Sequence, residues 1–460
     1  MPRPILDFVA AVGLAALLGS PASAAPYVFV PALASQVAPG TGGGTYASFG
    51  FVDVDPLGAV VFSAAVSGGT APGGLFSVAR PAALKSRAIA LVGDAAPGAS
   101  PATFAEFQGA TILGSEVAFL ATFDVQGQAG IYLADLDSGT LTLVAKVGDP
   151  SPTGAVFQQL GVPSNRCGDV VFAGAVGPSE LLLTHGIFRS AGGTLSSVAL
   201  EGDPAPGYDQ GTTFQSFGDP NCEFTSPNRV GFSANVTLLA LPPSSGVFRY
   251  AGATGELIAA QGDPSPDGVP YGPFSVESPG ASFQRLAYTD GAGLFLSAGP
   301  GFPAPVLMAR LGQTAPDTGG GTFAAFPRGP AAMSTDNGTL LVALAEVSGG
   351  STPSGVFRMF RSYSGVLSVG PDAIVGGAAP GTGGGTYSGF SRPAAADASN
   401  PYIGESGVIA FAADVSGGTA SSGVFVLPEP GGLPAGLAGV ALLALLCAAT
   451  ECSSPRPPRS

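Results

Sequence analysis

The sequence is poor in histidine, tryptophan and charged residues. Its 460 residues include one histidine, His185, no tryptophan and four cysteines, and only 10% are Asp, Glu, Lys or Arg. A single histidine excludes an HExxH zinc centre and a histidine-rich metal site. A histidine-dependent catalytic triad would have to use His185, which we expect in a loop, where a lone histidine is usually structural.

Acidic residues outnumber basic ones, and glycine and proline are abundant. The net charge of −14 and the pI near 4.3 argue against nucleic-acid binding, which needs a basic face. The 71 glycines and 43 prolines alone would suggest a low-complexity chain, but regularly spaced apolar runs argue against that interpretation. At 460 residues the chain exceeds the size at which one core keeps growing, which favours several domains or a repeat array.

One segment recurs along the chain. Residues 38–49, Ala-Pro-Gly-Thr-Gly-Gly-Gly-Thr-Tyr-Ala-Ser-Phe, return almost unchanged at 379–390 and slightly altered at 315–326, with four weaker copies between. The first prolines of the seven copies lie 50 to 64 residues apart, which is the range of propeller blades or other all-β arrays. The predicted units are 38–95, 96–150, 151–204, 205–264, 265–314, 315–378, and 379–426 together with 25–37.

Each unit contains four strand-like pieces with a period of two. The first is short and aromatic, and the second is apolar or tiny on both faces, as in Val60 to Val66. Such a strand must be buried on both sides, between neighbouring sheets. Four-stranded units repeated seven times predict an all-β protein, a β-propeller of seven blades. An open β-solenoid and a ring of six or eight blades are the alternatives.

The two ends of the repeat region are complementary. The last unit stops after its third strand at Val426, and the segment from Ala32 to Val37 stands in the position of a fourth strand. We therefore expect the N-terminal segment to complete the seventh blade and close the ring. Residues 27–30 also have a strand-like pattern and compete for the same place.

The N-terminal segment has the three parts of a secretory signal. Arg3 supplies the positive charge, residues 8–18 are apolar, and Ala22-Ser23-Ala24 resembles a cleavage site. Residues 1–24 are therefore predicted to be a signal peptide and the protein to be exported. The alternative is a buried core helix.

The C-terminal segment has the pattern of a membrane anchor. A Pro-Glu-Pro linker at 427–432 precedes the uncharged residues 433–449, and the final residues 450–460 contain two arginines. A helix of about 17 residues spans roughly 26 Å, enough for a thin bilayer, with the arginines on the cytoplasmic side. The tail resembles the PEP-CTERM sorting signal of bacteria. That resemblance implies recognition by an exosortase, a membrane transpeptidase, and transfer to the cell surface.

The predicted second strands carry a further resemblance. Residues 165–172, Asn-Arg-Cys-Gly-Asp-Val-Val-Phe, and the matching segments 55–62 and 404–411 are similar to the NxxGxxAF tandem repeat of exported bacterial proteins. The similarity covers most of residues 38–426. It implies a surface protein of unknown activity.

The best candidate site is a Gly-Asp pair that recurs at four unit junctions. The four carboxylates belong to Asp94, Asp149, Asp203 and Asp263, and the junctions at Gln313 and Gly377 lack one. Each aspartate could cap a turn through backbone N–H groups. In a closed ring the four would lie on one face, where they could form a rim for Ca²⁺ or a polar ligand. No other cofactor is expected, because the glycine-rich segment at 40–44 precedes a strand and is interpreted as a turn, not a phosphate loop.

Two further sets of residues recur at matching positions. Arg189, Arg249 and Arg358 follow the third-strand aromatic residue, and we interpret them as solvated ends of outer strands, with a ligand-binding ring as the alternative. Cys167 and Cys222 occupy equivalent connections of units three and four. Export permits a disulfide between them, but the spacing leaves the pairing open.

These features favour a binding or structural module over an enzyme. The expected partners are a glycan, a matrix polymer or a neighbouring envelope protein, together with the membrane itself, and nucleic acid is not expected. The alternative is an extracellular hydrolase or lyase that acts on polysaccharide through carboxylates. A purely structural envelope component is the third interpretation.

Overall fold

The computed structural model describes most of the repeat region. The chain divides into two units, Met1–Val28 with Leu433–Ser460, and Phe29–Gly432. The described residues run from 29 to 427 without 56–57, 80–84, 180, 224–228, 238–242, 275–278, 283–284, 300–302, 328–329, 336–337, 391–401 and 404–408. The predicted signal peptide and the predicted C-terminal span lie outside them. No helix in the described part is long and apolar enough to cross a bilayer.

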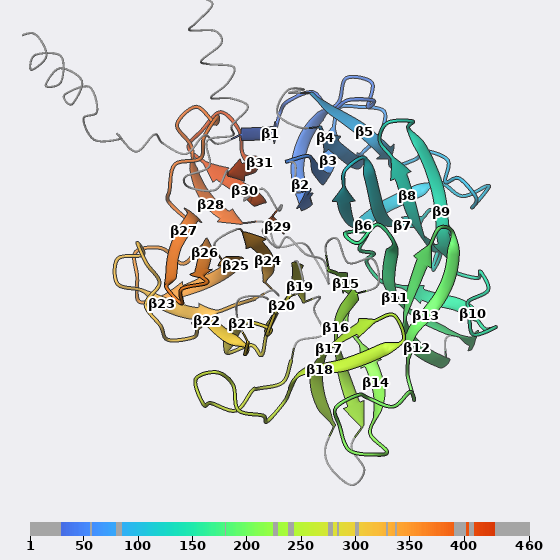
Figure 1. Ribbon diagram of the computed structural model, residues 1–460. Coiled ribbons are helices and arrows are strands. Elements are labelled where there is room, and N and C mark those ends of the chain that lie inside the picture. Colours follow the sequence, from blue (N-terminus) through green and yellow to red (C-terminus); the bar gives the residue numbers. More distant parts are fainter. Residues whose placement is uncertain are drawn as a thin grey trace, which may run out of the picture. The chain divides into compact units, whose positions relative to one another are not determined.

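Seven antiparallel sheets form a ring, so the predicted seven-bladed β-propeller is confirmed (Figure 1). Blade 1 comprises β2 (Thr45–Val54), β3 (Val60–Ser67), β4 (Gly73–Val78) and β5 (Ser86–Leu91). Blade 2 comprises β6 (Phe104–Leu113), β7 (Glu116–Phe123), β8 (Ala129–Asp135) and β9 (Thr140–Lys146). Blade 3 comprises β10 (Val156–Leu160), β11 (Val170–Ser179), β12 (Leu182–Ala191) and β13 (Thr194–Leu200).

The remaining blades follow the same order from the inner to the outer strand. Blade 4 comprises β14 (Thr213–Phe217), β15 (Asn221–Cys222), β16 (Arg229–Thr237), β17 (Ser244–Ala251) and β18 (Thr254–Ala260), and blade 5 comprises β19 (Gly280–Ser282), β20 (Arg285–Thr289), β21 (Gly293–Leu296) and β22 (Val306–Arg310). Blade 6 comprises β23 (Thr322–Ala325), β24 (Ala331–Thr335), β25 (Gly338–Ser348), β26 (Ser354–Ser362) and β27 (Leu367–Ile374). Blade 7 comprises β28 (Thr386–Phe390), β29 (Tyr402–Ile403), β30 (Ile409–Ser416), β31 (Ser422–Leu427) and β1 (Phe29–Leu33).

The N-terminal strand closes the ring, as predicted. β1 pairs antiparallel with β31, with Phe29 opposite Val426 and Leu33 opposite Gly423. The strand ends at Leu33, so it combines parts of the two segments that compete for this place in the sequence, and residues 34–37 turn into blade 1. This pairing covers the outer edge of β31, which would otherwise expose unpaired backbone groups.

Aromatic side chains form the core of each blade. In blade 1, Tyr46 of the first strand meets Phe76 of the third edge-on, with ring centroids 5.1 Å apart, and Phe62 of the second strand stacks on Phe76 at 5.8 Å. The same edge-on pair occurs in the other blades: Phe104–Tyr132, Phe157–Phe188, Phe214–Phe248, Tyr271–Phe295, Phe323–Phe357 and Tyr387–Phe425. Val60, Val61 and Phe62 are fully buried, which confirms that the second strand is covered on both faces.

In several blades the first strand is longer than predicted, because it continues past the aromatic segment toward the inside of the ring. In blades 1 and 2 it is one strand of 10 residues with bulges. In blades 4, 6 and 7 it is broken in two, and both pieces pair with the same second strand. The inner pieces, such as β15 and β24, lie near the middle of the ring (Figure 1).

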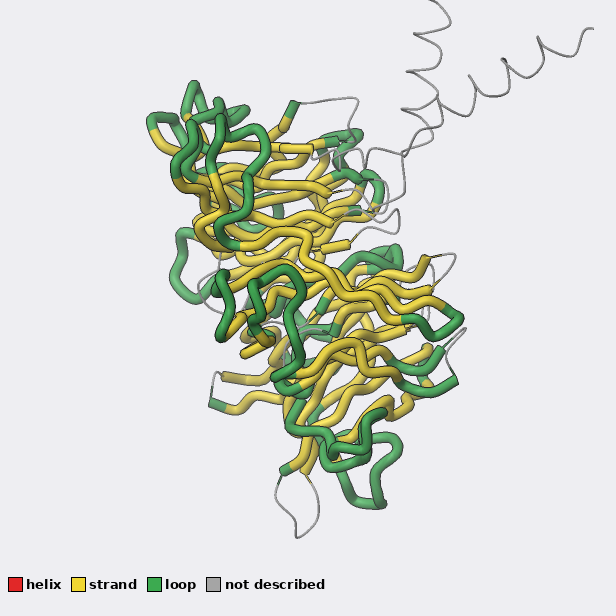
Figure 2. Tube along the Cα trace, turned by 90° about the vertical axis from the view of Figure 1, so that its left-hand side faces the viewer, coloured by secondary structure: helices red, strands yellow, loops and turns green. Residues whose placement is uncertain are grey.

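The loops gather at two ends of the sheets (Figure 2). The junction face carries the connections between blades and the turns between second and third strands, for example 34–44 and 68–72. The exit face carries the other two sets of turns, for example 136–139 and 363–366, and β31 ends there at Leu427.

The glycine-rich repeat is a turn on the junction face, as predicted. Gly40, Gly42 and Gly43 have positive φ angles of 76°, 68° and 99°, which glycine adopts without strain. The buried Thr41 hydroxyl donates to the carbonyl of Ala38 at 2.7 Å. The Thr41 carbonyl in turn accepts from the N–H of Thr70 at 2.7 Å, so the loop is fastened to the turn between β3 and β4.

Candidate functional site

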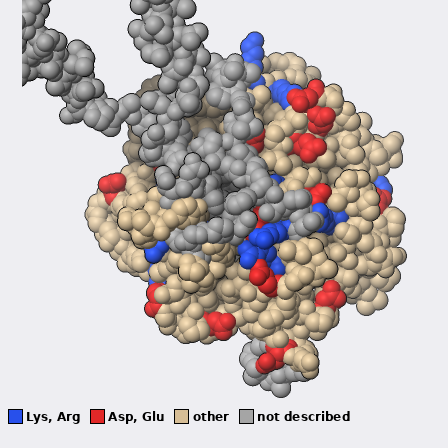
Figure 3. Space-filling model, viewed as in Figure 1, with Lys and Arg blue, Asp and Glu red and all other residues tan. Residues whose placement is uncertain are grey.

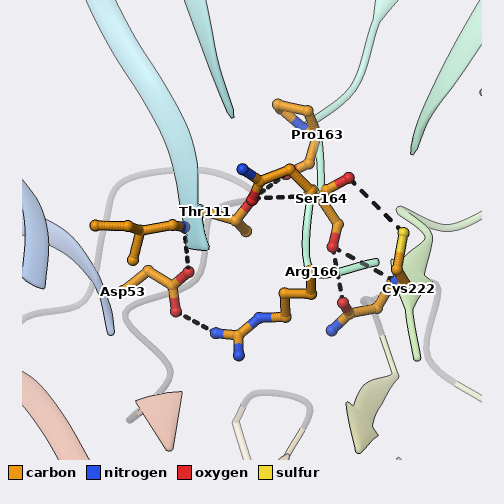
Figure 4. Close-up of polar contacts among 9 residues, drawn as sticks. Asp53, Thr111, Pro163, Ser164, Arg166 and Cys222 are labelled. Carbon is orange, nitrogen blue, oxygen red and sulfur yellow. Dashed lines mark hydrogen bonds and ion pairs between the residues drawn. The ribbon is translucent and has the colours of Figure 1, made fainter. Parts of the chain in front are cut away.

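A polar network joins the inner sides of blades 1 to 4 (Figure 4), and its blade 3 members lie in the connection between β10 and β11. Its first member is Asp53 of β2, which is fully buried and is the one charged residue of that strand. The Asp53 carboxylate accepts a hydrogen bond from the N–H of Ile112 in blade 2 at 2.9 Å and forms an ion pair with Arg166 of blade 3. One carboxylate therefore holds three blades together.

Asn165 links blade 3 to blade 2. Its Oδ1 accepts from the Thr111 hydroxyl at 2.9 Å, and its Nδ2 donates to the carbonyl of Glu116 at 3.1 Å. Gly168 has a φ of 84° and donates its N–H to the Asn165 carbonyl, which makes a tight turn. In this blade the Asn and Gly of the NxxG pattern thus serve packing between blades and turn geometry.

Blades 3 and 4 are joined beside this turn. Cys167 and Cys222 form a disulfide with their Cα atoms 5.2 Å apart, so the pairing that the sequence leaves open is present in the structure. The hydroxyl of Ser164 donates to Oδ1 of Asn221 at 2.9 Å. The inner edges of four consecutive blades are therefore connected by polar or covalent contacts.

A second charged group lies in blade 4. The fully buried side chain of Glu223 pairs with Arg249 at 3.2 Å and with Arg229 at 3.5 Å, and Arg249 also pairs with Glu256. Burial raises the pKa of Glu223, and Arg249 opposes that rise. Burial likewise raises the pKa of Asp53, opposed mainly by Arg166.

The recurrent arginines are not solvated strand ends, so that interpretation is wrong. Their side chains are 18%, 15% and 11% exposed for Arg189, Arg249 and Arg358. Arg189 donates through Nε to Asp169 at 2.8 Å, and Arg358 pairs with Asp372 at 2.7 Å. Each arginine is held by a carboxylate of its own blade, which accounts for its recurrence without a ligand.

The four junction aspartates lie on the junction face. The carboxylates of Asp94, Asp149 and Asp203 accept from the backbone N–H three residues earlier, at 2.9, 3.2 and 2.9 Å. Gln313 makes the same contact with Arg310 at 2.9 Å. Asp263 occupies the corresponding turn, where its N–H donates to the carbonyl of Ala260. These contacts are those of turn caps. Among the described residues no group of three or more His, Cys, Asp or Glu side chains could hold a metal, and the Ca²⁺ rim stays a prediction.

His185 lies in a strand, not in the predicted loop. It belongs to β12, is partly exposed, and its Nδ1 is 3.0 Å from Oε2 of Glu201, which also accepts from the His185 N–H. Among the described residues, no Ser, Cys or Asp side chain forms a hydrogen bond with the imidazole ring of His185. His185 is thus part of a surface pair on the outer side of blade 3.

Asp219 is a carboxyl group that no recurrent sequence pattern singles out. It lies between β14 and β15, partly buried, next to Gly161 of blade 3. Burial raises its pKa to about 6, and a hydrogen bond from the N–H of Val162 opposes the rise. No such pattern singles out Asp53 either. The signal for Asp53 is a lone charge directly after the apolar residues Phe51 and Val52.

The visible face of the propeller carries little charge. Most described atoms in Figure 3 belong to uncharged residues, and the basic and acidic side chains near its middle lie close to one another.

Comparison with known proteins identifies a family. A family model described as a family of unknown function, DUF7453, matches residues 28–177 and 164–282. None of the curated proteins matches the chain.

Solved structures of similar fold include an oligogalacturonate lyase in complex with manganese (11% identity, TM-score 0.45, 88% of this chain and 98% of that one). Others are an oligogalacturonate lyase from Vibrio parahaemolyticus (10%, 0.43, 88% and 94%) and the β-propeller domain of the Trilobed protease from Pyrococcus furiosus (9%, 0.44, 83% and 95%). At these identities the likeness concerns the fold alone. The residues matched by the family model span more than half of the sequence, and the chain belongs to the family of unknown function DUF7453.

Proposed function

We propose that the protein is an exported β-propeller that is retained at the bacterial cell surface and serves as a binding or structural module of the envelope. The observation that carries the proposal is that the two buried carboxylates near the inner strands are both occupied by contacts within the protein. Asp53 is held by Arg166 and a backbone N–H, and Glu223 is held by two arginines. Carboxylates committed in this way stabilise blade contacts and are poor candidates for an acid and base that act on a substrate.

The proposed compartment rests on the two ends of the sequence. Residues 1–24 have the pattern of a secretory signal, and the Pro-Glu-Pro motif before residues 433–449 resembles a sorting signal. The disulfide between Cys167 and Cys222 supports export, because such bonds persist mainly in oxidising compartments. In this proposal an exosortase-like enzyme is the sorting partner, and a glycan or an envelope protein is the ligand.

One observation favours an enzyme as the second candidate. The pKa of Asp219 is raised to about 6 by burial, and a carboxyl group of that kind is suited to donate a proton near neutral pH. A polysaccharide hydrolase or lyase would need a second carboxylate close to it. The described residues place Gly161 and the Val162 N–H beside Asp219, and neither supplies that group.

The proposal is tested by localisation and by capture. A chain that ends at Leu427 should be released into the medium, whereas the full chain should stay with the cells and be cut by protease added to intact cells. Glu451→Gln, which keeps the apolar segment, is the matched control and should be retained. The purified propeller should then be retained on envelope polysaccharide or capture an envelope protein. Retention of the truncated chain inside the cells, or failure of the full chain to reach the surface, would overturn the proposal.

A further inference from the structure

The last strand of the propeller points out of the exit face. In blade 7, Leu427 at the end of β31 lies opposite Ile409, the first residue of β30. In the neighbouring blade 6, Ser362 at the end of β26 lies opposite Gly338, the first residue of β25. The third strands of both blades run in the same direction. Leu427 of blade 7 and the turn at 363–366 of blade 6 therefore lie at the same end of their sheets, on the exit face.

That turn of blade 6 and the first residue of β27 carry exposed apolar side chains. Tyr363, Val366 and Leu367 are 42%, 65% and 38% exposed. The guanidinium of Arg285 in blade 5 lies over the Tyr363 ring, 6.0 Å from its centroid. In the corresponding turns of blades 2, 3 and 4 the exposed residues are small or polar, and Leu136 of blade 2 is buried. These exposed residues are Asp137-Ser138-Gly139, Gly192-Gly193 and Gly252-Ala253.

The blade on the other side of blade 7 carries positive charge at the same end. Lys85 and Arg87 of blade 1 are exposed, at the start of the fourth strand β5. Ser86 lies opposite Val78, the last residue of the third strand, which places this pair on the exit face. An aromatic and apolar turn and a pair of cations therefore flank the blade from which the C-terminal segment departs.

We propose that the exit face docks on a lipid bilayer through Tyr363, Val366 and Leu367, assisted by Lys85 and Arg87. This inference rests on the proposed C-terminal anchor. Only residues 428–432 separate Leu427 from the apolar segment, and five extended residues span at most about 18 Å. A tether of that length holds the exit face near the lipid headgroups. Aromatic, aliphatic and basic side chains together are typical of surfaces that lie in the membrane interface.

The test uses the full chain with its C-terminal segment, reconstituted in vesicles that contain a phospholipid with a photoreactive diazirine in its acyl chain. One set of vesicles is pure phosphatidylcholine, and a second contains about 30% phosphatidylglycerol to engage the cations. After illumination, lipid adducts are mapped by mass spectrometry. We expect the peptide with residues 362–367 to be labelled several-fold more than the hairpin tip at Leu181 and Leu182 on the junction face, although those leucines are 93% and 68% exposed.

Variants give the matched comparison. Val366→Ser with Leu367→Ser should lower labelling of the exit face by about fivefold, because less apolar area is buried in the docked state. Leu181→Ser with Leu182→Ser should leave it unchanged. Equal labelling of both faces, or an effect of the control variant equal to that of the patch variant, would overturn docking while leaving the anchor intact.

Two other outcomes also overturn the inference. If the full chain does not float with the vesicles, the anchor fails and docking fails with it. Protection of residues 362–367 from hydrogen exchange is measured at several protein-to-lipid ratios. If this protection rises with the number of protein molecules per vesicle and not with the amount of lipid, the patch is a contact between copies of the chain. Stronger labelling in the phosphatidylglycerol vesicles would support the role of Lys85 and Arg87.

Discussion

Asp53 and Arg166, which are 113 residues apart in the sequence, form a buried ion pair that joins blade 1 to blade 3. The residue after Arg166 is Cys167, which is bonded to Cys222 of blade 4. The ion pair and the disulfide therefore connect three blades at their inner strands. The ring is fastened in two places, by this inner network and by the pairing of β1 with β31.

Removal of Arg166 should destabilise the protein strongly. In Arg166→Ala the buried Asp53 carboxylate loses its counter-ion, and we expect the free energy of unfolding to fall by about 3–5 kcal/mol. The two side chains are 10% and 0% exposed. Lys146→Ala is the control, because its pair with Asp149 is 28% and 30% exposed and should contribute about 0–1 kcal/mol. Urea unfolding of both variants measures the difference, and equal effects would contradict the assigned role.

The disulfide should add substantially to stability. It closes a separation of 55 residues, which corresponds to about 4 kcal/mol in the chain-entropy model. Cys167→Ser with Cys222→Ser should lower the melting temperature, and dithiothreitol should lower that of the natural protein but not that of the double variant. If dithiothreitol leaves the melting temperature of the natural protein unchanged under conditions that unfold it, the disulfide contributes little to stability.

Asp219 should make stability depend on pH. Its pKa is raised from 3.8 to about 6 in the folded protein, so between about pH 4 and 6 the unfolded chain releases a proton that the folded protein retains. Stability should therefore fall as the pH rises through this window, by at most about 3 kcal/mol.

Asp219→Asn removes this loss and keeps an acceptor for the Val162 N–H. The melting temperature of the variant minus that of the natural protein should therefore be larger at pH 7.5 than at pH 4. A difference between the two proteins that is the same at both pH values would contradict a raised pKa.

Two adjacent glycines should respond differently to alanine. A Cβ on Gly69 would lie 2.5 Å from the Thr41 carbonyl oxygen and 2.9 Å from Cα of Gly44, so Gly69→Ala must displace backbone and should cost more than about 2 kcal/mol. Gly68 has a φ of 71° and open space around its Cβ position. Gly68→Ala should cost only about 1 kcal/mol. Thermal unfolding of the two variants provides the comparison, and the reverse order would show that the loop is not fastened as described.

Ring closure is tested by a pair of variants in the N-terminal segment. Phe29 is 9% exposed and belongs to a core cluster that includes Val424 and Val426 of β31. Phe29→Ala should cost about 3 kcal/mol or more. Val37, which is 65% exposed, lies beyond the strand, and Val37→Ala should change stability by less than about 0.5 kcal/mol. Similar small effects of both would mean that β1 does not close the ring in solution.

The sequence predicted the blades and their closure because both depend on local patterns. Period-two strands, the turn at 40–44 and the missing fourth strand after Val426 are all visible in single segments. The exact closing strand was harder, because β1 draws on parts of both candidate segments.

The polar network could not be predicted, because it depends on contacts between blades. Nothing in the spacing of Asp53 and Arg166 indicates that ring curvature brings them together. The same limit explains the error about Arg358, whose partner Asp372 lies across the hairpin from β26 to β27. Since a positive side chain after an aromatic residue has the same pattern whether it is solvated or paired, only the fold distinguishes the two.

The most direct test of the proposed function measures retention and turnover on the same polymers. The purified protein is incubated with a panel of neutral and acidic polysaccharides and with isolated envelope, and bound protein, new reducing ends and unsaturated uronate products are measured together. We predict retention on at least one envelope polymer with no product above that of heat-treated protein. Product that forms with the natural protein and is lost in Asp219→Asn would contradict the account and establish the enzyme in its place.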